Sequence, residues 1–188
     1  VENNTGNLAK TGFTFDGWYT TASGTGGTAY VAGTGTLTTT SDLTLFAKWN
    51  AASYAVTYET GAGASAAPTQ ANTMYGASFN LPTAPTRARF NFLGWETGTL
   101  ANATLFAPGS SYTMGSSAVA FTAKWSGLSY VVVYLLNGGS GTAPTQADVS
   151  HGLGFTTAAA PTRTGFTFTG WSDGATVINP PTPTLVSN

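Results

Sequence analysis

The sequence contains few of the residues from which most active sites are built. It has no cysteine, which excludes disulfides, thiolate nucleophiles and thiolate metal ligands. Its single histidine, His151, makes a His-rich metal site or a conventional catalytic triad hard to assemble. Only 7% of its 188 residues are charged, against about 25% in an average soluble protein. Six basic residues and a net charge of −1 cannot neutralise a run of phosphates, so nucleic acid is not expected as a partner.

Long hydrophobic runs are also missing. The most apolar segment, residues 130–136, is far shorter than the roughly 18 to 20 residues of a membrane-spanning helix, so membrane insertion is not expected. The low charge does not indicate disorder, because 41% of the residues are hydrophobic and 13% are aromatic. The composition indicates a folded chain with an uncharged surface, on which little electrostatic repulsion keeps copies apart.

What the sequence does contain is a repeat with a period of 76 residues. The letters AKW end at Trp49 and again at Trp125, and the loop APTQA occurs twice at the same separation. A motif of the form Phe-x-Phe-x-Gly-Trp occurs three times, ending at Trp18, Trp95 and Trp171. Self-similarity at a fixed period is the signature of a tandem repeat architecture.

Both ends of the chain fall inside a repeat. We predict the C-terminal half of a repeat at residues 1–50, a complete repeat at 51–126, and the N-terminal portion of a third repeat at 127–188. The third repeat has a Pro-rich end in place of a recognisable strand ending in KW.

Each repeat is predicted to be mainly β. Apolar and polar residues alternate in the closing segment (43–49), the opening segment (54–59) and the motif segment (89–93), as strands with one buried face require. Pro and Gly separate these segments, and no stretch shows a clean helical period. The expected fold is therefore a series of small β modules of about 76 residues with little helix. One short helix within residues 64–78 is left open.

A module of this size without disulfides must rely on its aromatic residues for a core. The residues predicted to form the structural core are Trp18, Trp49, Trp95, Trp125, Trp171, Phe90, Phe92, Phe166 and Phe168. The glycine before each motif tryptophan indicates a backbone with positive φ or a close approach at that point.

The motif GFTFDGW, followed by YTTASGTGG, a GT-rich stretch and SDLTLFAKW, resembles the Listeria–Bacteroides repeat, also called the internalin B-type B repeat. The resemblance extends over nearly the whole chain. It implies a compact β-grasp-like module repeated along bacterial surface or secreted proteins. In such proteins the module acts as a stalk or interaction unit and has no known catalytic site.

No catalytic residue, cofactor or metal site is predicted. His151 lies at the repeat position of Tyr75, each followed by glycine, so we interpret it as filling an aromatic-sized structural position. The acidic residues are scattered and do not recur between repeats. Lys48 and Lys124 do recur. They are interpreted as charges that protect a strand end from edge pairing, with an isopeptide bond as the alternative.

Neighbouring repeats or further copies of the protein are expected as partners, for two reasons. The third opening segment carries Val131, Val133 and Leu135 where the second carries Ala55, Thr57 and Glu59. A strand that is apolar on both faces should be covered by a neighbouring repeat or a further copy of the protein. Strand exchange between half-repeats would build a fibre.

The function expected is that of a non-catalytic, extracellular bacterial protein, either secreted or attached to the cell surface. It would serve as a stalk, an adhesin or a fibre subunit, with host or matrix glycans or proteins as further partners. The alternative is a carbohydrate-binding module, in which exposed aromatic rings stack on sugars.

Overall fold

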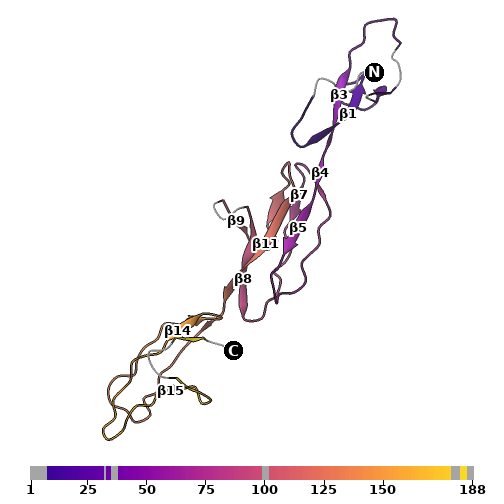
Figure 1. Ribbon diagram of the computed structural model, residues 1–188. Coiled ribbons are helices and arrows are strands. Elements are labelled where there is room, and N and C mark those ends of the chain that lie inside the picture. Colours follow the sequence, from indigo (N-terminus) through magenta and orange to yellow (C-terminus); the bar gives the residue numbers. More distant parts are fainter. Residues whose placement is uncertain (1–7, 32, 35–37, 99–101, 179–182, 186–188) are drawn as a thin grey trace. The chain divides into compact units, whose positions relative to one another are not determined.

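The computed structural model describes residues 8–31, 33–34, 38–98, 102–178 and 183–185 (Figure 1). These residues form strands, turns and loops without a helix, which confirms the mainly β fold. The stretch 64–78, where a short helix was left open, is extended and contains β6 (Thr73–Met74). Part of the predicted Pro-rich end, residues 179–182, lies outside the described residues.

The chain folds into two compact units. One comprises Val1–Gly61, Ala66–Ala84 and Gly94–Ala123, and the other comprises Ala62–Ser65, Pro85–Leu93 and Lys124–Asn188. These units do not coincide with the sequence repeats, and the division at residues 50 and 126 stays a prediction.

The complete repeat holds the largest sheet, of four strands in the order β5, β11, β8, β9 (Figure 1). Their bounds are Val56–Glu59 for β5, Val119–Gly127 for β11, Phe90–Thr97 for β8 and Thr104–Phe106 for β9. β11 runs parallel to β5, whereas β9 runs antiparallel to β8. In β5, Val56 and Tyr58 are buried and Thr57 and Glu59 are exposed, as the alternation predicts.

Phe121 on β11 is the centre of this repeat's core. Its ring is fully buried and stacks on Tyr58 at 5.5 Å between ring centroids. The edges of three more rings pack around it, at 5.1 Å for Tyr112, 6.1 Å for Phe106 and 6.5 Å for Phe79. Aromatic side chains thus hold the module together, as its small size and lack of cysteine require.

The first repeat forms a three-stranded antiparallel sheet in the order β2 (Ala29–Tyr30), β1 (Phe13–Tyr19), β3 (Phe46–Ala51). The pairing of β1 with β3 shifts register between Phe15 and Gly17, which marks a β-bulge. Gly17 has φ 145°, and a Cβ there would lie 2.9 Å from the Tyr30 carbonyl oxygen. The predicted positive φ and close approach before the motif tryptophan are therefore confirmed in this repeat.

The remaining strands form two-stranded antiparallel sheets. In the complete repeat these are β4 (Ser53–Tyr54) with β6, and β7 (Ser78–Asn80) with β10 (Ser111–Thr113). The third repeat contains β12 (Ser129–Tyr130) with β13 (Val149–Ser150), β14 (Gly154–Thr156) with β17 (Pro183–Leu185), and β15 (Trp171–Ser172) with β16 (Val177–Ile178). Since β12, β13 and β14 lie 76 residues after β4, β6 and β7, the third repeat reproduces the start of the second.

Candidate functional site

In the complete repeat, the strand that opens the repeat pairs with the strand that closes it. Val56 lies opposite Val119 and Tyr58 opposite Phe121, in parallel register. The Val119 amide also donates a hydrogen bond to the Ala55 carbonyl at 3.0 Å. This parallel ladder supplies backbone hydrogen bonds and also brings the ring of Phe121 into the core.

The described part of the first repeat contains the closing half of this ladder. By the 76-residue register, residues 43–46 correspond to 119–122, and we call them the free closing segment. Among the described residues they have no parallel partner: β3 is the edge of its sheet and begins only at Phe46. Leu43 and Phe46 are each 39% exposed. The strand predicted over 43–49 is therefore wrong for residues 43–45, because no neighbouring strand offers them hydrogen bonds.

The described part of the third repeat contains the opening half of the ladder. Residues 132–135 correspond to β5, and we call them the free opening segment. They lie beyond the end of β12 and belong to no strand. The predicted interface residues are open to solvent, with exposed fractions of 71% for Val131, 72% for Val133 and 78% for Leu135. The partner that would cover them stays a prediction.

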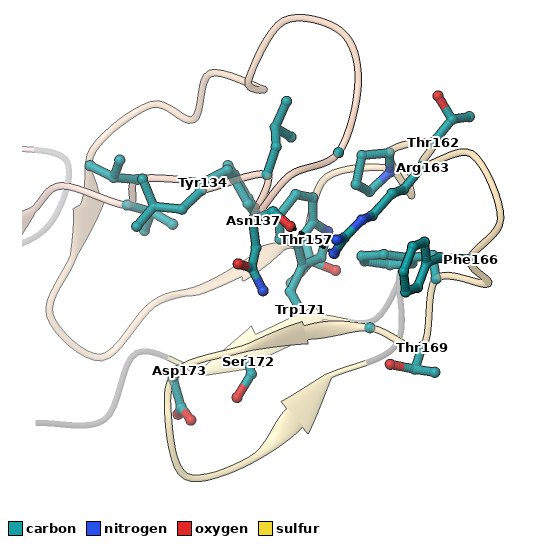
Figure 2. Close-up of a pocket in the computed structure, with 18 of the residues that line it drawn as sticks. Tyr134, Asn137, Thr157, Thr162, Arg163, Phe166, Thr169, Trp171, Ser172 and Asp173 are labelled. Carbon is teal, nitrogen blue, oxygen red and sulfur yellow. Dashed lines mark hydrogen bonds between the residues drawn. The ribbon is translucent and has the colours of Figure 1, made fainter.

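A cavity of about 600 Å³ lies beside the free opening segment (Figure 2). Its lining includes Tyr134, Phe155 and Trp171. In the register of the repeat, Tyr134 and Phe155 correspond to Tyr58 and Phe79, which both pack against Phe121. The cavity therefore occupies the place that the complete repeat fills with a ring from its closing strand.

The aromatic wall of the cavity consists of Tyr134 and Trp171, and both side chains form hydrogen bonds with the backbone of Ala158. The Ala158 amide donates to the Tyr134 hydroxyl at 3.0 Å, and Trp171 Nε1 donates to the Ala158 carbonyl at 2.8 Å. The rings of Tyr134 and Trp171 meet edge to face at 4.6 Å. The hydroxyl of Thr157, also in the lining, is buried without a partner among the described residues. The wall is thus held in place although no strand of the described residues covers the cavity.

The complete repeat contains the equivalent hydrogen bond from its motif tryptophan but lacks the one to the tyrosine hydroxyl. Trp95 Nε1 donates to the Pro82 carbonyl at 3.0 Å. Because proline has no N–H, Pro82 cannot donate to Tyr58 as Ala158 donates to Tyr134. The Tyr58 hydroxyl is buried with no partner among the described residues, and burial raises the pKa of this phenol.

The first repeat is joined to the complete repeat by two backbone hydrogen bonds and one ring contact. The Ala52 amide donates to the Gly12 carbonyl at 2.8 Å, and the Tyr75 amide donates to the Ala52 carbonyl at 2.8 Å. The Phe13 ring packs edge to face on Tyr75 at 5.4 Å. Gly12 has φ 79°, and a Cβ there would overlap the Tyr75 ring, so only glycine fits.

The third repeat is joined by the same three contacts. Leu128 donates to the Arg89 carbonyl at 2.8 Å, His151 donates to the Leu128 carbonyl at 2.7 Å, and the Phe90 ring packs on His151 at 5.3 Å. This confirms that His151 takes the position of Tyr75. Arg89 occupies the position of Gly12 with φ 65°, an unusual conformation for a residue with a side chain. The ring opposite this position is the imidazole of His151, which is smaller than the Tyr75 ring opposite Gly12.

Comparison with known families agrees with this repeated geometry. The Listeria-Bacteroides repeat domain matches residues 2–48, 54–124 and 130–186. The chain belongs to this family.

In these Listeria-Bacteroides repeats the predicted core residues divide into two groups. Trp95 is fully buried, and Trp18, Trp49, Trp125 and Trp171 are half-buried. Their partners include the second phenylalanine of the motif, as in Phe15 with Trp49, Phe92 with Trp125 and Phe168 with Trp171, at 5.3 to 5.4 Å.

The first phenylalanine of the motif belongs to the joins between repeats. Phe13 and Phe90 contact a ring of the following repeat, as described above. Phe166 is 66% exposed, with Arg163 over one face at 4.0 Å, as Arg87 lies over Phe90 at 3.9 Å. The prediction that Phe166 is a core residue is wrong, because no described ring from a following repeat packs on it.

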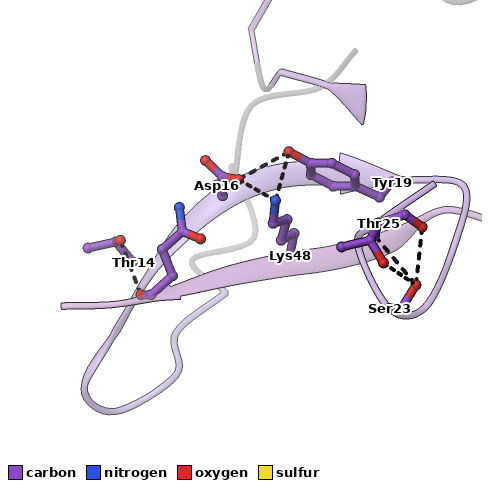
Figure 3. A network of polar contacts seen from close by, with 7 residues as sticks. Thr14, Asp16, Tyr19, Ser23, Thr25 and Lys48 are labelled. Carbon is purple, nitrogen blue, oxygen red and sulfur yellow. Dashed lines mark hydrogen bonds and ion pairs between the residues drawn. The ribbon is translucent and has the colours of Figure 1, made fainter. Parts of the chain in front are cut away.

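A polar network on the first repeat accounts for one of the recurring lysines (Figure 3). Lys48 Nζ lies 3.5 Å from Asp16 Oδ2 and donates to the Tyr19 hydroxyl at 3.5 Å, and that hydroxyl donates to Asp16 at 3.1 Å. The hydrogen bond to Tyr19 and the charge of Asp16 raise the pKa of Lys48. Lys48 is therefore an ion-pair partner that connects β1 and β3.

The described residues contain no cluster of three or more His, Cys, Asp or Glu that could hold a metal ion. The same residues contain no helix that is long and apolar enough to cross a membrane. The site residues that sequence reasoning missed are those of the joins, above all Gly12 and Arg89. The sequence pattern that could have identified them is that Gly12 and Arg89 are 77 residues apart, the same separation as between Trp18 and Trp95.

Relatives of the chain are longer proteins. It is 29% identical over 178 residues to a protein of Evansella cellulosilytica named "Putative Gly-rich membrane protein", and 31% identical over 163 residues to another named "Putative membrane protein". The alignments cover 88% and 86% of this chain but only 20% and 23% of those proteins. The chain thus spans about a fifth of the length of these relatives. No solved structure matches it.

Proposed function

We propose that the chain is a section of a non-catalytic, extracellular repeat array that serves as a stalk or adhesin on a bacterial surface. The observation that carries the proposal is the join between repeats. Two hydrogen bonds and a ring contact recur there with nearly the same distances, although Tyr75 is replaced by His151 and Gly12 by Arg89. Preservation of a join despite changed residues is what a spacing or load-bearing array requires.

The surface agrees with this role. With 7% charged residues and many Thr, Ser and Ala side chains, the chain has few groups that could serve acid–base or nucleophilic chemistry. Membership of a family of surface repeats and relatives named as membrane proteins support an extracellular location.

A change in repeat number tests the proposal. One further copy of residues 51–126 would be inserted in frame into the bacterial protein that contains this chain. We expect protease treatment of intact cells to release the repeats, and we expect binding by the rest of the protein to continue at a greater distance from the cell. Retention of the repeats inside the cell, or turnover of a substrate by the purified chain, would refute the proposal.

The alternative, a carbohydrate-binding module, has weaker support. Sugar stacking needs an open aromatic face, and Trp95 has no exposed surface. The most exposed aromatic ring, that of Phe166, has Arg163 over one face. Binding on a glycan array that is lost in Phe166→Ala would favour this alternative.

A further inference from the structure

The inner face of the hairpin formed by β8 and β9 becomes polar beyond the core of the complete repeat. Trp95 lies opposite Phe106, and two residues further along the strand Thr97 lies opposite Thr104. Residues directly opposite each other in an antiparallel pair place their side chains on the same face, and that face recurs at every second residue. The two threonines therefore continue the face that carries Trp95 and Phe106, with hydroxyl groups in place of rings.

A groove of about 470 Å³ lies at this polar end of the face, a volume typical of small-molecule sites. Glycine, alanine and one valine make up the apolar part of its lining, and none of the described residues in the lining is charged. The whole groove belongs to the complete repeat, in which the opening and closing strands are both present and paired. The polar side chains of the lining are Thr97, Asn102, Thr104, Tyr112 and Ser117.

The polar groups of the groove are free to bind a ligand. None of these five side chains forms a hydrogen bond with another described residue. Hydroxyl groups elsewhere in the same repeat do have partners: those of Ser78 and Thr113 bond to each other at 2.9 Å, and that of Ser110 donates to the Ala107 carbonyl at 2.7 Å. Four hydroxyl groups and one amide thus surround the groove without a protein partner.

The fold holds two sides of the groove in place. The Tyr112 ring packs edge to face on Phe106 at 5.6 Å and on Phe121 at 5.1 Å, so its position is set by the core. On the other side, Gly98 has φ 99°, and a Cβ there would lie 2.6 Å from the Asn102 carbonyl oxygen. Glycine at position 98 therefore permits the close approach that brings Asn102 to the groove.

We propose that this groove binds a neutral saccharide. Hydroxyl and amide groups both donate and accept hydrogen bonds, as the hydroxyl groups of a sugar do. A phosphate or carboxylate would meet no cation in the lining, and burial of an unpaired charge is costly. A purely apolar ligand would cover the hydroxyl groups and leave them without partners.

This mode of binding uses hydroxyl groups, so it does not need the open aromatic face that sugar stacking requires. The inference rests on the proposed function in its adhesin form, since it names the class of ligand that the repeat would hold.

NMR on the full 188-residue chain measures binding, with the methyl glycosides of glucose, galactose, mannose and N-acetylglucosamine as probes. Glucuronate is the charged comparison. We expect at least one neutral glycoside to shift the amide signals of Gly98, Gly115 and Ser117 in a saturable manner. Glucuronate should shift them much less, because the lining holds no cation.

A first variant fills the groove. Gly115 lines it, and a Cβ at this position meets no atom within 4 Å, so Gly115→Leu should fold normally. We expect this variant to lose saturable binding. The matched control is Ala67→Leu, which replaces an exposed residue of the same repeat outside the groove and should bind as the unchanged chain does.

A second variant removes hydroxyl groups. Thr97→Val with Thr104→Val keeps the β-branched shape of both side chains and should weaken binding about tenfold or more, as loss of two hydrogen bonds predicts. The control Thr57→Val with Thr122→Val replaces two exposed threonines that lie outside the groove and should leave binding unchanged.

Absence of saturable shifts with all four glycosides would overturn the proposal. So would binding of glucuronate as tight as that of the neutral sugars, or unchanged binding in Gly115→Leu. These outcomes leave the stalk function standing, since the change in repeat number tests that function without any sugar.

Discussion

Two tyrosines at equivalent positions of the repeat should differ in their response to loss of the hydroxyl group: the free energy of unfolding should rise for one and fall for the other. Tyr58 and Tyr134 are each 6% exposed, and each packs edge to face on the motif tryptophan of its repeat. Only Tyr134 has a hydrogen-bond partner for its hydroxyl, the Ala158 amide. A proline at position 82 removes that donor in the complete repeat.

The expected magnitudes follow from the cost of burying polar groups. A buried hydroxyl without a partner costs about 1 to 3 kcal/mol, and a satisfied hydrogen bond contributes about 1 kcal/mol net. Tyr58→Phe keeps the ring that stacks on Phe121 and removes the unpaired group, so it should raise the free energy of unfolding by about 1 kcal/mol. Tyr134→Phe should lower it by about 1 to 2 kcal/mol, because the Ala158 amide is left unpaired.

The assay must follow the two repeats separately in one chain. The indole N–H groups of Trp95 and Trp171 donate to Pro82 and Ala158, so their NMR signals report on the complete and the third repeat. Urea titrations of each variant, followed at these two signals, give two unfolding curves. Destabilisation of both repeats by similar amounts would refute the reasoning.

A third variant tests the cause. Pro82→Ala restores an N–H at the position of Ala158, while the Trp95 indole can still donate to the carbonyl. In this background Tyr58→Phe should become destabilising by about 1 kcal/mol. If Tyr58→Phe stays stabilising there, the missing proline N–H is not the reason for the unpaired hydroxyl.

Other predictions concern pH, the joins and the core. Burial raises the pKa of Tyr58, so the fold favours the neutral phenol over the phenolate; stability is unaffected by ionisation below the ordinary pKa of about 10 and is lost as pH rises through the higher folded value. The midpoint pH of alkaline unfolding, followed by circular dichroism, should therefore be higher in Tyr58→Phe. His151→Tyr should cost about 1 to 3 kcal/mol by overpacking against Arg89, and adding Arg89→Gly should recover it in thermal melts. Trp95→Ala should cost about 3 to 5 kcal/mol and remove the protection of β11 amides from hydrogen exchange. Gly94→Ala should break the pairing of β8 with β9, because its Cβ would lie 2.6 Å from the Phe106 carbonyl oxygen, and the amides of β9 would then exchange rapidly.

Much of the fold could be predicted from side-chain alternation and from the recurrence of residues. Alternation located β5, β8 and β11. The recurrence of His151 at the position of Tyr75 predicted an aromatic-sized structural position, and in the structure its ring packs against Phe90. The role of the motif's first phenylalanine could not be predicted. Phe166 and Phe168 have the same alternation, but Phe168 contacts the tryptophan of its own repeat and Phe166 lies on the joining face. Spacing within one repeat does not distinguish these two environments.

The parallel ladder shows why alternation alone does not determine a strand. Residues 43–45 alternate like the strand to which they correspond, and residues 132–135 are apolar throughout, yet neither segment forms a strand. In the complete repeat Val56 and Val119 pair across more than 60 residues of chain, so this ladder forms only after that long loop has closed. A segment whose hydrogen-bonding partner is so distant in sequence depends on that partner and not on its own propensity. If the ladder opens, it exposes an edge like the one that residues 132–135 present.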